Sequence, residues 1–383
     1  MREFTLVAPC HFGTGAVLKR EIYDMGYDVT AVTDGRVAFA GDAEAVVRAN
    51  FSLRTAERVL LLVGNVHAET FDELFEGIKA LPWEDYLPRN ARFWVTKASS
   101  VRSKLFSGSD IQRIAKKAMV ERMKMTYSIE QFPEDGDDYP VRIFFRDDVA
   151  EVAIDTSGDS LHKRGYRALH GEAPISETLA ASVIGLTPWR PGRILVDPFC
   201  GSGTFPIEAA MIACHIAPGI NRSFTAQKWT HLIPKALWDE IRDELKSEIN
   251  IPSPDEVDIQ GYDADPQVLK AARANAQAAG VDSIIHFQHR EVKDLSHHGS
   301  YGFVITNPPY GERLEERSAL PALYGQIADG MKRLDTWSFY IISGWDGTEG
   351  AIGRKSNKRR KLYNGMIRTD LFMYPGPKPP RRK

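Results

Sequence analysis

The chain has few cysteines, no long apolar run and almost no net charge, and each shortage excludes a kind of protein. Only three of its 383 residues are cysteines, and they show neither the paired spacing of metal ligands nor a disulfide framework. They are Cys10, Cys200 and Cys214. No apolar stretch approaches the length of a membrane span, and the first residues lack a signal-peptide pattern. We therefore expect a cytoplasmic protein with no metal site and no membrane partner.

The balance of charge limits how the chain can bind a polyanion. A formal net charge of -2 argues against a surface that binds nucleic acid everywhere, so such contacts would have to come from local basic patches. Charged residues make up 26% and hydrophobic residues 43% of the sequence, which is typical of a globular protein. At 383 residues the chain is long enough for two or three domains, each with its own core.

A tetrapeptide at the end of an apolar run is the stretch around which the chain is organised. Residues 303–305 are β-branched or aromatic, and they predict a short buried strand that ends at Thr306. In an open α/β sheet, substrates bind at the carboxyl ends of the strands. The four residues that follow this strand are Asn307, Pro308, Pro309 and Tyr310. We expect them to be the catalytic residues of an enzyme.

The chemistry suited to these residues is methylation of an exocyclic amine on a nucleic-acid base. The side-chain oxygen of Asn307 and the carbonyl oxygen of Pro308 could accept both N–H hydrogens and turn the nitrogen lone pair toward a methyl donor. Tyr310 offers a ring on which a flipped base can stack. An ordinary Asn-Pro turn leaving a strand explains the same residues, and the tetrapeptide alone leaves both interpretations open.

A second stretch, residues 197–204, is a glycine-containing turn between an apolar strand and a helix. Its glycines allow the backbone to approach a ligand closely, and the carboxylate at the strand end can fix a cofactor amine or an ordered water. The turn is not a dinucleotide fingerprint, because Pro206 stands where the third glycine would be, and no phosphate-loop pattern follows. The predicted cofactor residues in it are Asp197, Pro198, Phe199, Cys200, Gly201, Ser202, Gly203 and Thr204.

Together, the two stretches resemble those of class I S-adenosylmethionine-dependent amino-methyltransferases. Four further stretches narrow the resemblance to bacterial 23S ribosomal RNA guanine-N2 methyltransferases that carry a THUMP RNA-binding domain. These stretches are residues 71–78, 155–158, 161–167 and 173–180. The resemblance covers nearly the whole chain, and it implies S-adenosyl-L-methionine as the cofactor and ribosomal RNA as the partner.

The resemblance implies an α/β fold with an α+β region ahead of the catalytic domain. The catalytic domain would be a Rossmann-like class I methyltransferase domain, with a mostly parallel seven-stranded sheet that ends in an antiparallel hairpin. An Asn-Gly pair at Asn364 and Gly365, between two β-rich segments, independently predicts that hairpin. The domains are expected at residues 1–66 (ferredoxin-like), 67–156 (THUMP), 157–172 (linker) and 173–383 (methyltransferase).

Four residues outside the turn complete the predicted cofactor site. Asp263 ends the predicted second strand, where a bidentate acceptor suits two ribose hydroxyls, and Ala264 follows it. Asp265, which precedes a proline, instead looks like a helix cap. By resemblance, Asp294 accepts from the adenine amine and Thr178 contacts the methionine end of the cofactor. A surface carboxylate and a helix-cap segment, respectively, explain these last two residues equally well.

Basic residues in the THUMP-like region form the predicted RNA-contact patch. Charge pattern alone favours a solvated helix face there, and only the resemblance shifts the interpretation toward phosphate contacts. The patch consists of Lys97, Arg102, Lys104, Arg113, Lys116 and Lys117. Arg313, after the tetrapeptide, is expected to hold a phosphate that flanks the target base. An inserted segment, residues 217–250, mixes aromatic and basic side chains, which suits RNA contact as well as a core.

These observations predict an enzyme that transfers a methyl group to an exocyclic base amine, and the resemblance implies guanine N2 of 23S ribosomal RNA as the target. An adenine-N6 methyltransferase acting on RNA or DNA would carry the same tetrapeptide. A non-catalytic RNA-binding protein with a degenerate pocket is a further alternative, and a nicotinamide oxidoreductase is disfavoured by the missing third glycine. The sequence leaves open the oligomeric state and whether residues 1–66 contact RNA.

Overall fold

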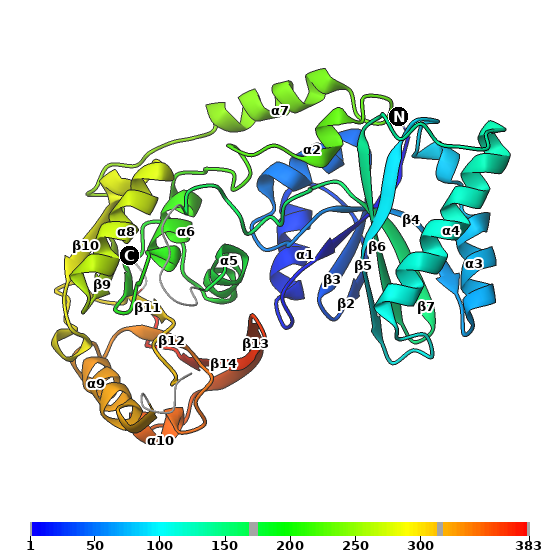
Figure 1. The fold of residues 1–383 in the computed structure, drawn as a ribbon. Helices are drawn as coiled ribbons and strands as arrows, with labels where there is room; N and C mark the ends of the chain where they lie inside the picture. Colours follow the sequence, from blue (N-terminus) through cyan, green and yellow to red (C-terminus); the bar gives the residue numbers. More distant parts are fainter. Residues whose placement is uncertain (1, 168–174, 312–316, 381–383) are drawn as a thin grey trace.

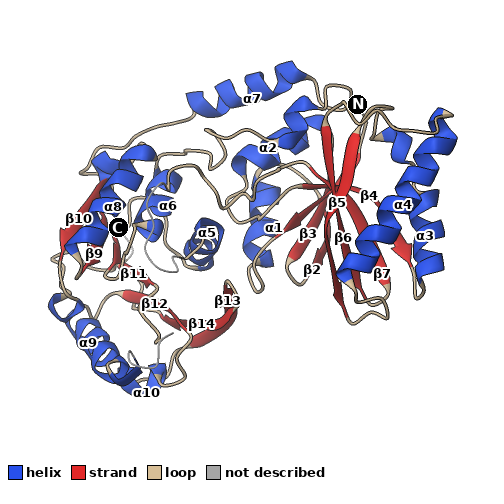
Figure 2. Cartoon of the chain, viewed as in Figure 1, coloured by secondary structure: helices blue, strands red, loops and turns tan. Residues whose placement is uncertain are grey.

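The computed structural model describes residues 2–167, 175–311 and 317–380, and it contains two seven-stranded sheets that lie in separate halves of the molecule (Figure 1, Figure 2). The amino-terminal sheet has the strand order β2-β3-β1-β4-β7-β6-β5, and the carboxyl-terminal sheet has the order β10-β9-β8-β11-β12-β14-β13. In the described residues, no helix is long and apolar enough to cross a membrane.

Two α+β units share the amino-terminal sheet. The first contains β1 (Phe4–Pro9), α1 (Gly15–Asp24), β2 (Val29–Thr33), β3 (Arg36–Gly41) and α2 (Ala43–Ser52). The second contains α3 (Phe71–Ala80), β5 (Arg92–Val101), α4 (Gly108–Tyr127), β6 (Asp138–Arg146) and β7 (Val149–Asp155). Between them, β4 (Leu60–His67) pairs antiparallel with β1 on one side and with β7 on the other. The two units are therefore joined through continuous backbone hydrogen bonding.

The carboxyl-terminal sheet confirms the predicted methyltransferase architecture. Its strands are β8 (Leu195–Asp197), β9 (Ile259–Asp263), β10 (Ile285–His289), β11 (Phe303–Thr306), β12 (Ser338–Ser343), β13 (Lys358–Asn364) and β14 (Ile367–Tyr374). The first five of these strands pair in parallel, and β14 runs antiparallel to β12 and β13. The connecting helices are α5 (Glu177–Leu186), α6 (Thr204–Ala213), α8 (Pro266–Ala278), α9 (Leu320–Arg333) and α10 (Thr348–Ile352).

Helices cover both faces of this sheet, which explains why its central strand, β11, is buried throughout and apolar at three of its four positions. All four residues of β11 are buried. Phe303 and Ile305 pack in the cluster that includes α6 and α8, whereas Val304 packs with residues of α9. Successive side chains of a strand point to opposite faces, so a strand between two helix layers favours apolar residues on both of its faces.

The inserted segment 217–250 links the two halves of the molecule through apolar contacts. It contains α7 (Lys235–Ser247), which lies beside α2 (Figure 1). The ring of Trp229 stacks on Tyr139 of β6 with centroids 4.8 Å apart, and its indole N–H donates to the Asp138 carbonyl. Phe224 is also buried, against Phe51. These aromatic residues belong to the core. Of the two interpretations of this segment, RNA contact and core packing, the structure supports core packing.

The predicted hairpin is present, but its loop differs by one residue from the pattern expected for Asn-Gly. Asn364 pairs with Ile367 as the last residue of β13, and the two loop residues are Gly365 and Met366. Gly365 has φ of +59°, which a glycine adopts without strain. The side chain of Asn364 is therefore a strand side chain, available for contacts near the carboxyl edge of the sheet.

Candidate active site

The predicted catalytic tetrapeptide begins where β11 leaves the sheet, beside the turn that follows β8. These strands are parallel neighbours, so their carboxyl ends meet at one edge. The hydroxyl of Thr306, at the end of β11, donates a 2.6 Å hydrogen bond to Asp197, at the end of β8. Both side chains are buried. This bond joins the predicted catalytic and cofactor stretches directly.

The side chain of Asn307 presents an acceptor that the described part of the protein does not use. Its Oδ1 atom is buried, and no described residue donates a hydrogen bond to it. Leaving a buried acceptor unpaired costs about 1–3 kcal/mol, so such atoms are rare in folded proteins and need an explanation. A hydrogen-bond donor on a bound substrate would satisfy this oxygen.

The backbone after Asn307 is held by a buried tyrosine. The Tyr324 hydroxyl of α9 donates to the carbonyl of Pro309 at 3.3 Å and lies 2.8 Å from the Ser343 hydroxyl. Burial raises the pKa of Tyr324 to about 12, so the phenol stays protonated and can donate. This hydrogen bond fixes the backbone of the tetrapeptide two residues after Asn307.

The ring of Tyr310 is positioned by the hairpin and by the end of β12. The side-chain amide of Asn364 donates a 3.0 Å hydrogen bond to the Tyr310 hydroxyl. A Cβ atom at Gly344 would lie 3.3 Å from the ring, so glycine at this position leaves room for the tyrosine. The structure therefore brings Asn307, Tyr310 and the hairpin to the same edge of the sheet.

The glycine turn combines one packed glycine with one open glycine. Gly203 has φ of +88°, and a Cβ there would lie 3.1 Å from the Phe287 ring. Gly201 has φ of +52°, and a Cβ there would meet no atom within 4 Å. The backbone N–H of Gly201 donates to Asp263 at 3.0 Å. Gly203 thus packs the turn onto β10, while Gly201 borders the open space that a cofactor can occupy.

Two groups of this turn have strongly shifted ionisation. Burial raises the pKa of Asp197 to about 7, and hydrogen bonds from Thr306 and the Phe199 N–H only partly oppose this rise. The nearby carboxylate of Asp263 adds a smaller increase. Burial also raises the pKa of the Cys200 thiol well above its ordinary value. Cys200 therefore stays a neutral thiol, whereas Asp197 can change charge near neutral pH.

Asp263 ends β9, as the sequence predicted, and its carboxylate contacts the turn. One Asp263 oxygen accepts from Gly201, and the other accepts from the Asp265 N–H at 3.0 Å. The Asp265 side chain caps α8 by accepting from the Gln267 N–H, which confirms its interpretation as a helix cap. The carbonyl of Ala264 is 3.0 Å from Nε2 of His289. The ribose-binding role of Asp263 stays a prediction.

The other two predicted cofactor residues differ in their surroundings. Asp294 is exposed in η4 (Val292–Asp294), which follows β10, and its adenine contact stays a prediction. Thr178 is fully buried; its hydroxyl donates to Glu57 and lies 3.2 Å from Nε2 of His11. Its side chain therefore faces the amino-terminal region, and these contacts do not support a cofactor role. Sequence reasoning could not find this pairing, because its partners lie more than a hundred residues away.

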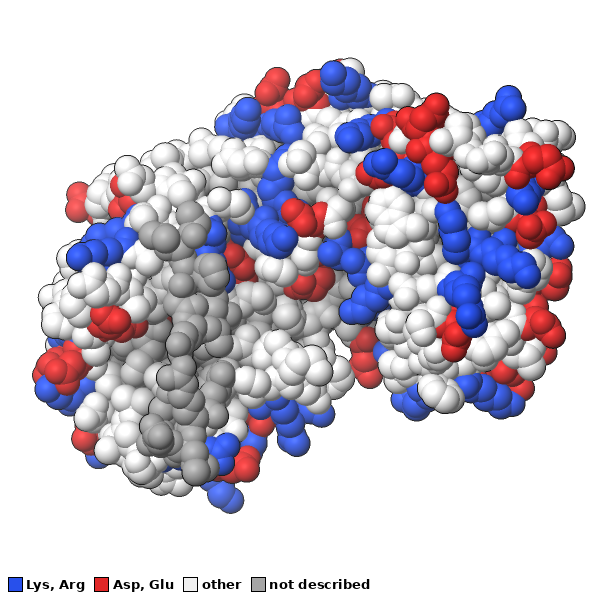
Figure 3. All heavy atoms as spheres, in the orientation of Figure 1, with Lys and Arg blue, Asp and Glu red and all other residues white. Residues whose placement is uncertain are grey.

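The predicted RNA-contact patch lies on β5, on α4 and on the segment that connects them, and most of its charges are paired with carboxylates. Figure 3 shows basic and acidic side chains intermixed on this side of the molecule. The ion pairs are Arg102–Asp147, Lys104–Glu69, Arg113–Asp110 and Lys116–Glu134. Lys97 and Lys117 form no such pair among the described residues. The patch stays a prediction, weakened by this compensation, and Arg313 lies outside the described residues.

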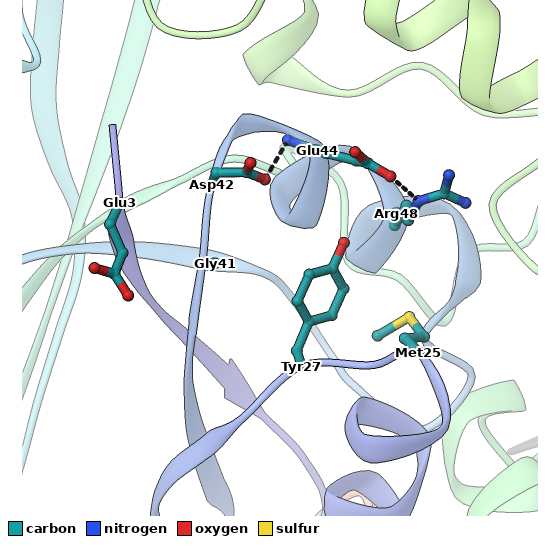
Figure 4. Close-up of a pocket in the computed structure, with 7 residues that line it drawn as sticks. All are labelled: Glu3, Met25, Tyr27, Gly41, Asp42, Glu44 and Arg48. Carbon is teal, nitrogen blue, oxygen red and sulfur yellow. Dashed lines mark hydrogen bonds and ion pairs between the residues drawn. The ribbon is translucent and has the colours of Figure 1, made fainter. Parts of the chain in front are cut away.

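A separate pocket lies in the amino-terminal region between β3 and α2 (Figure 4). Three of its polar side chains already have protein partners: Asp42 caps α2, and Arg48 pairs with Glu44 and with Glu244 of α7. The lining residues are Glu3, Met25, Tyr27, Gly41, Asp42, Glu44 and Arg48. We interpret the pocket as a junction between helices. Within the described ranges, no cluster of side chains is arranged to hold a metal ion.

Comparison with protein families identifies three regions of the chain. Residues 164–372 match the model of the RMKL-like methyltransferase domain. Residues 5–60 match the RlmL ferredoxin-like domain, and residues 68–155 match the THUMP domain.

Two curated relatives are similar over nearly the whole chain. YpsC of Bacillus subtilis (strain 168), which carries the provisional name of an RNA methyltransferase, is 44% identical over 100% of this chain and 99% of its own length. The ribosomal RNA large subunit methyltransferase K/L of Cellvibrio japonicus (strain Ueda107) is 31% identical over 96% of this chain. The chain spans 50% of that second relative.

Solved structures give the same result. A possible methylase from Clostridium difficile 630 matches with a TM-score of 0.93 and 45% identity, and the match covers 100% of both chains. SMU.472, crystallised with SAH, matches with a TM-score of 0.91 and 40% identity over 99% of this chain and 100% of its own. A predicted N6-adenine-specific DNA methylase from Listeria monocytogenes str. 4b F2365 matches with a TM-score of 0.90 and 44% identity over 98% and 97%.

Proposed function

Because this chain belongs to the RMKL-like methyltransferase family, and so is an S-adenosylmethionine-dependent RNA methyltransferase, we propose that it methylates an exocyclic base amine, namely guanine N2 of 23S ribosomal RNA. The relative named for methylation of large-subunit ribosomal RNA supports this target. We also infer a cytoplasmic location, which fits three buried free thiols and a ribosomal substrate.

The observation that carries the proposal is the buried side-chain oxygen of Asn307, to which no described residue donates. The carbonyl of the next residue, Pro308, supplies a second acceptor. Two acceptors at this point can take both hydrogens of an exocyclic amine and favour tetrahedral geometry at its nitrogen. The lone pair is then released from the aromatic ring and turned toward the methyl group. The amine becomes acidic only after the new bond forms, so the site needs no strong base before the attack.

Asp197, Gly201 and Asp263 are suited to hold S-adenosylmethionine. Gly201 leaves open space beside the turn, and the Asp263 carboxylate lies at a strand end within hydrogen-bond distance of that turn. Asp197, when ionised, is an acceptor for a cationic amine. The cofactor supplies an electrophilic methyl group, and the protein contributes the orientation of the two reactants, which is worth several kcal/mol of barrier.

The decisive experiment is transfer of labelled methyl groups to ribosomal RNA from cells that lack this gene, followed by nucleoside analysis. We expect label in N2-methylguanosine. Label in N6-methyladenosine would keep the mechanism and change the base, as the Listeria monocytogenes protein's description would suggest. A DNA substrate of the same length serves as the control for nucleic-acid type. Absence of label on naked and partly assembled ribosomal RNA would contradict the proposed substrate.

A further inference from the structure

We propose that Phe12, Lys361 and Tyr363 form a binding site for the RNA nucleotide next to the methylated base. This inference rests on the proposed function, because it assigns a second contact to the same RNA substrate. The site is built from two parts of the chain that are separated by about 350 residues of sequence and meet beside β13. Figure 1 shows β13 next to the end of α1, at the boundary between the two sheets.

The cluster has the composition of a site for single-stranded RNA. The rings of Phe12 and Tyr363 are in edge-to-face contact, with centroids 5.9 Å apart. The ammonium group of Lys361 lies 5.4 Å from the Phe12 ring centroid and 5.2 Å from that of Tyr363. Aromatic faces stack on any base, and a lysine beside them can meet the phosphate of the same nucleotide.

Phe12 is exposed although its neighbours in the sequence are fixed. Its side chain is 41% exposed. The Gly13 carbonyl accepts a 2.7 Å hydrogen bond from Arg360, and a Cβ at Gly13 would lie 2.6 Å from the Lys361 carbonyl. On the other side, His11 pairs with Glu57 at 3.0 Å. The protein thus holds the backbone around Phe12 firmly and leaves part of its ring exposed, which lowers the entropic cost of binding.

The cluster adjoins the candidate active site through the hairpin. Tyr363 directly precedes Asn364, whose side chain holds the hydroxyl of Tyr310. Successive side chains of a strand point to opposite faces, so the cluster and Tyr310 lie on opposite sides of β13 near its carboxyl end. An RNA strand that delivers one base to Tyr310 would cross the hairpin loop, where Met366 is 97% exposed, and place a neighbouring base on Phe12.

The inference is tested by replacing Phe12 with alanine and measuring methyl transfer to ribosomal RNA. We expect the KM for RNA to rise about five- to tenfold, with kcat within twofold of the parent and unchanged binding of S-adenosylhomocysteine, because only a stacking contact is lost. Phe12→Trp, which keeps an aromatic face, should have the same KM as the parent. Lys361→Ala should reduce the steepness of the plot of log RNA affinity against log salt concentration by about one.

Tyr23→Ala is a matched control, because Tyr23 is also exposed and also lies near a lysine, with Lys19 5.4 Å from its ring. It lies about 12 Å of helix rise beyond Gly15, the first residue of α1. The substitution is therefore remote from the cluster and should not change the KM for RNA. Equal KM values for the parent and Phe12→Ala, especially with a lower melting temperature, would overturn the inference and leave the cluster as a contact between domains.

A binding measurement separates failure of this inference from failure of the proposed function. Fluorescence anisotropy with labelled single-stranded oligouridine requires no methylation. If the parent methylates no ribosomal RNA, the proposed function fails; weaker oligouridine binding by Phe12→Ala than by Tyr23→Ala would still support the nucleotide site. Equal oligouridine binding by both variants would overturn the inference whether or not the parent is active.

Discussion

The side-chain oxygen of Asn307, which accepts no hydrogen bond from the described residues, lets a single substitution test the chemistry. Asn307→Ala removes this acceptor, so we expect turnover to fall by about a hundredfold or more, because one preorganised transition-state contact is worth roughly 2.7–4 kcal/mol. The cofactor affinity should stay within a few fold of the parent. Single-turnover methyl transfer and calorimetry with S-adenosylhomocysteine measure the two quantities. Turnover near the parent rate would remove Asn307 from the mechanism.

The raised pKa of Asp197 predicts that cofactor binding depends on pH. Only the ionised carboxylate attracts a cationic amine, and the pKa of Asp197 in the protein without cofactor is about 7. We therefore expect affinity for S-adenosylhomocysteine to increase from pH 6 to pH 8, with release of a proton on binding near pH 6.5. Calorimetry in two buffers of different ionisation enthalpy measures that proton. In Asp197→Asn, both the pH dependence and the proton release should disappear.

The raised pKa of Asp197 favours cofactor binding at high pH, but it makes the protein without cofactor less stable as pH rises. A carboxyl whose pKa is raised on folding binds more protons in the folded state, so its contribution to stability is present at low pH and lost as pH rises from about 4 through 7. Asp197→Asn should not show this loss. Melting temperatures of parent and variant across that pH range would reveal it, and parallel curves would contradict the assigned pKa shift.

At the scale of elements, local sequence signals located most of the active-site edge. Strand β11 and the turn after β8 were predictable, because β-branched runs and closely spaced glycines determine local conformation. Strand β2 lacks a clear apolar pattern, since four of its five residues are exposed. The hairpin was expected from its Asn-Gly pair, yet Asn364 lies in the strand and contacts Tyr310, a use that no local pattern indicates.

This contact makes the hairpin a positioning element for the catalytic tetrapeptide. Asn364→Ala removes the hydrogen bond to the Tyr310 hydroxyl, so we expect kcat to fall about fivefold, as the loss of roughly 1 kcal/mol implies. Tyr310→Phe removes the same bond and keeps the ring. The double variant should be no slower than the slower single variant. Additive losses in kcat would show that Asn364 does not act through Tyr310.

At the scale of the whole molecule, the contacts that join the two sheets are the least predictable. His11, Glu57 and Thr178 meet in one hydrogen-bonded group, although Thr178 lies 121 residues from Glu57. No spacing rule connects such distant positions, and Thr178 was accordingly assigned to the cofactor. Each unit of the chain has an ordinary apolar pattern of its own, and such a pattern does not say which kind of domain it forms. Only the family resemblance indicated the kinds of domain and their order.

Substitution of Glu57 tests how much the hydrogen-bonded group of His11, Glu57 and Thr178 contributes to holding the two halves of the molecule together. Burial alone would raise the pKa of Glu57, but hydrogen bonds from His11, His162 and Thr178 outweigh burial and lower it. Its contribution to stability is therefore complete above the ordinary carboxyl pKa of about 4.3 and is lost as pH falls below that value. We expect Glu57→Gln to reduce the free energy of unfolding at pH 7 by about 2 kcal/mol.

The matched control for Glu57→Gln is Glu69→Gln, which breaks an exposed ion pair with Lys104 and should change stability by less than about 1 kcal/mol. The difference in melting temperature between the parent and Glu57→Gln should narrow between pH 5 and pH 3, because the parent alone loses a stabilising charge there. A constant difference across this range would mean that the charge of Glu57 does not cause the difference in stability between the parent and Glu57→Gln. The two halves of the molecule would then be joined by shape and hydrogen bonding, without a contribution from the buried charge of Glu57.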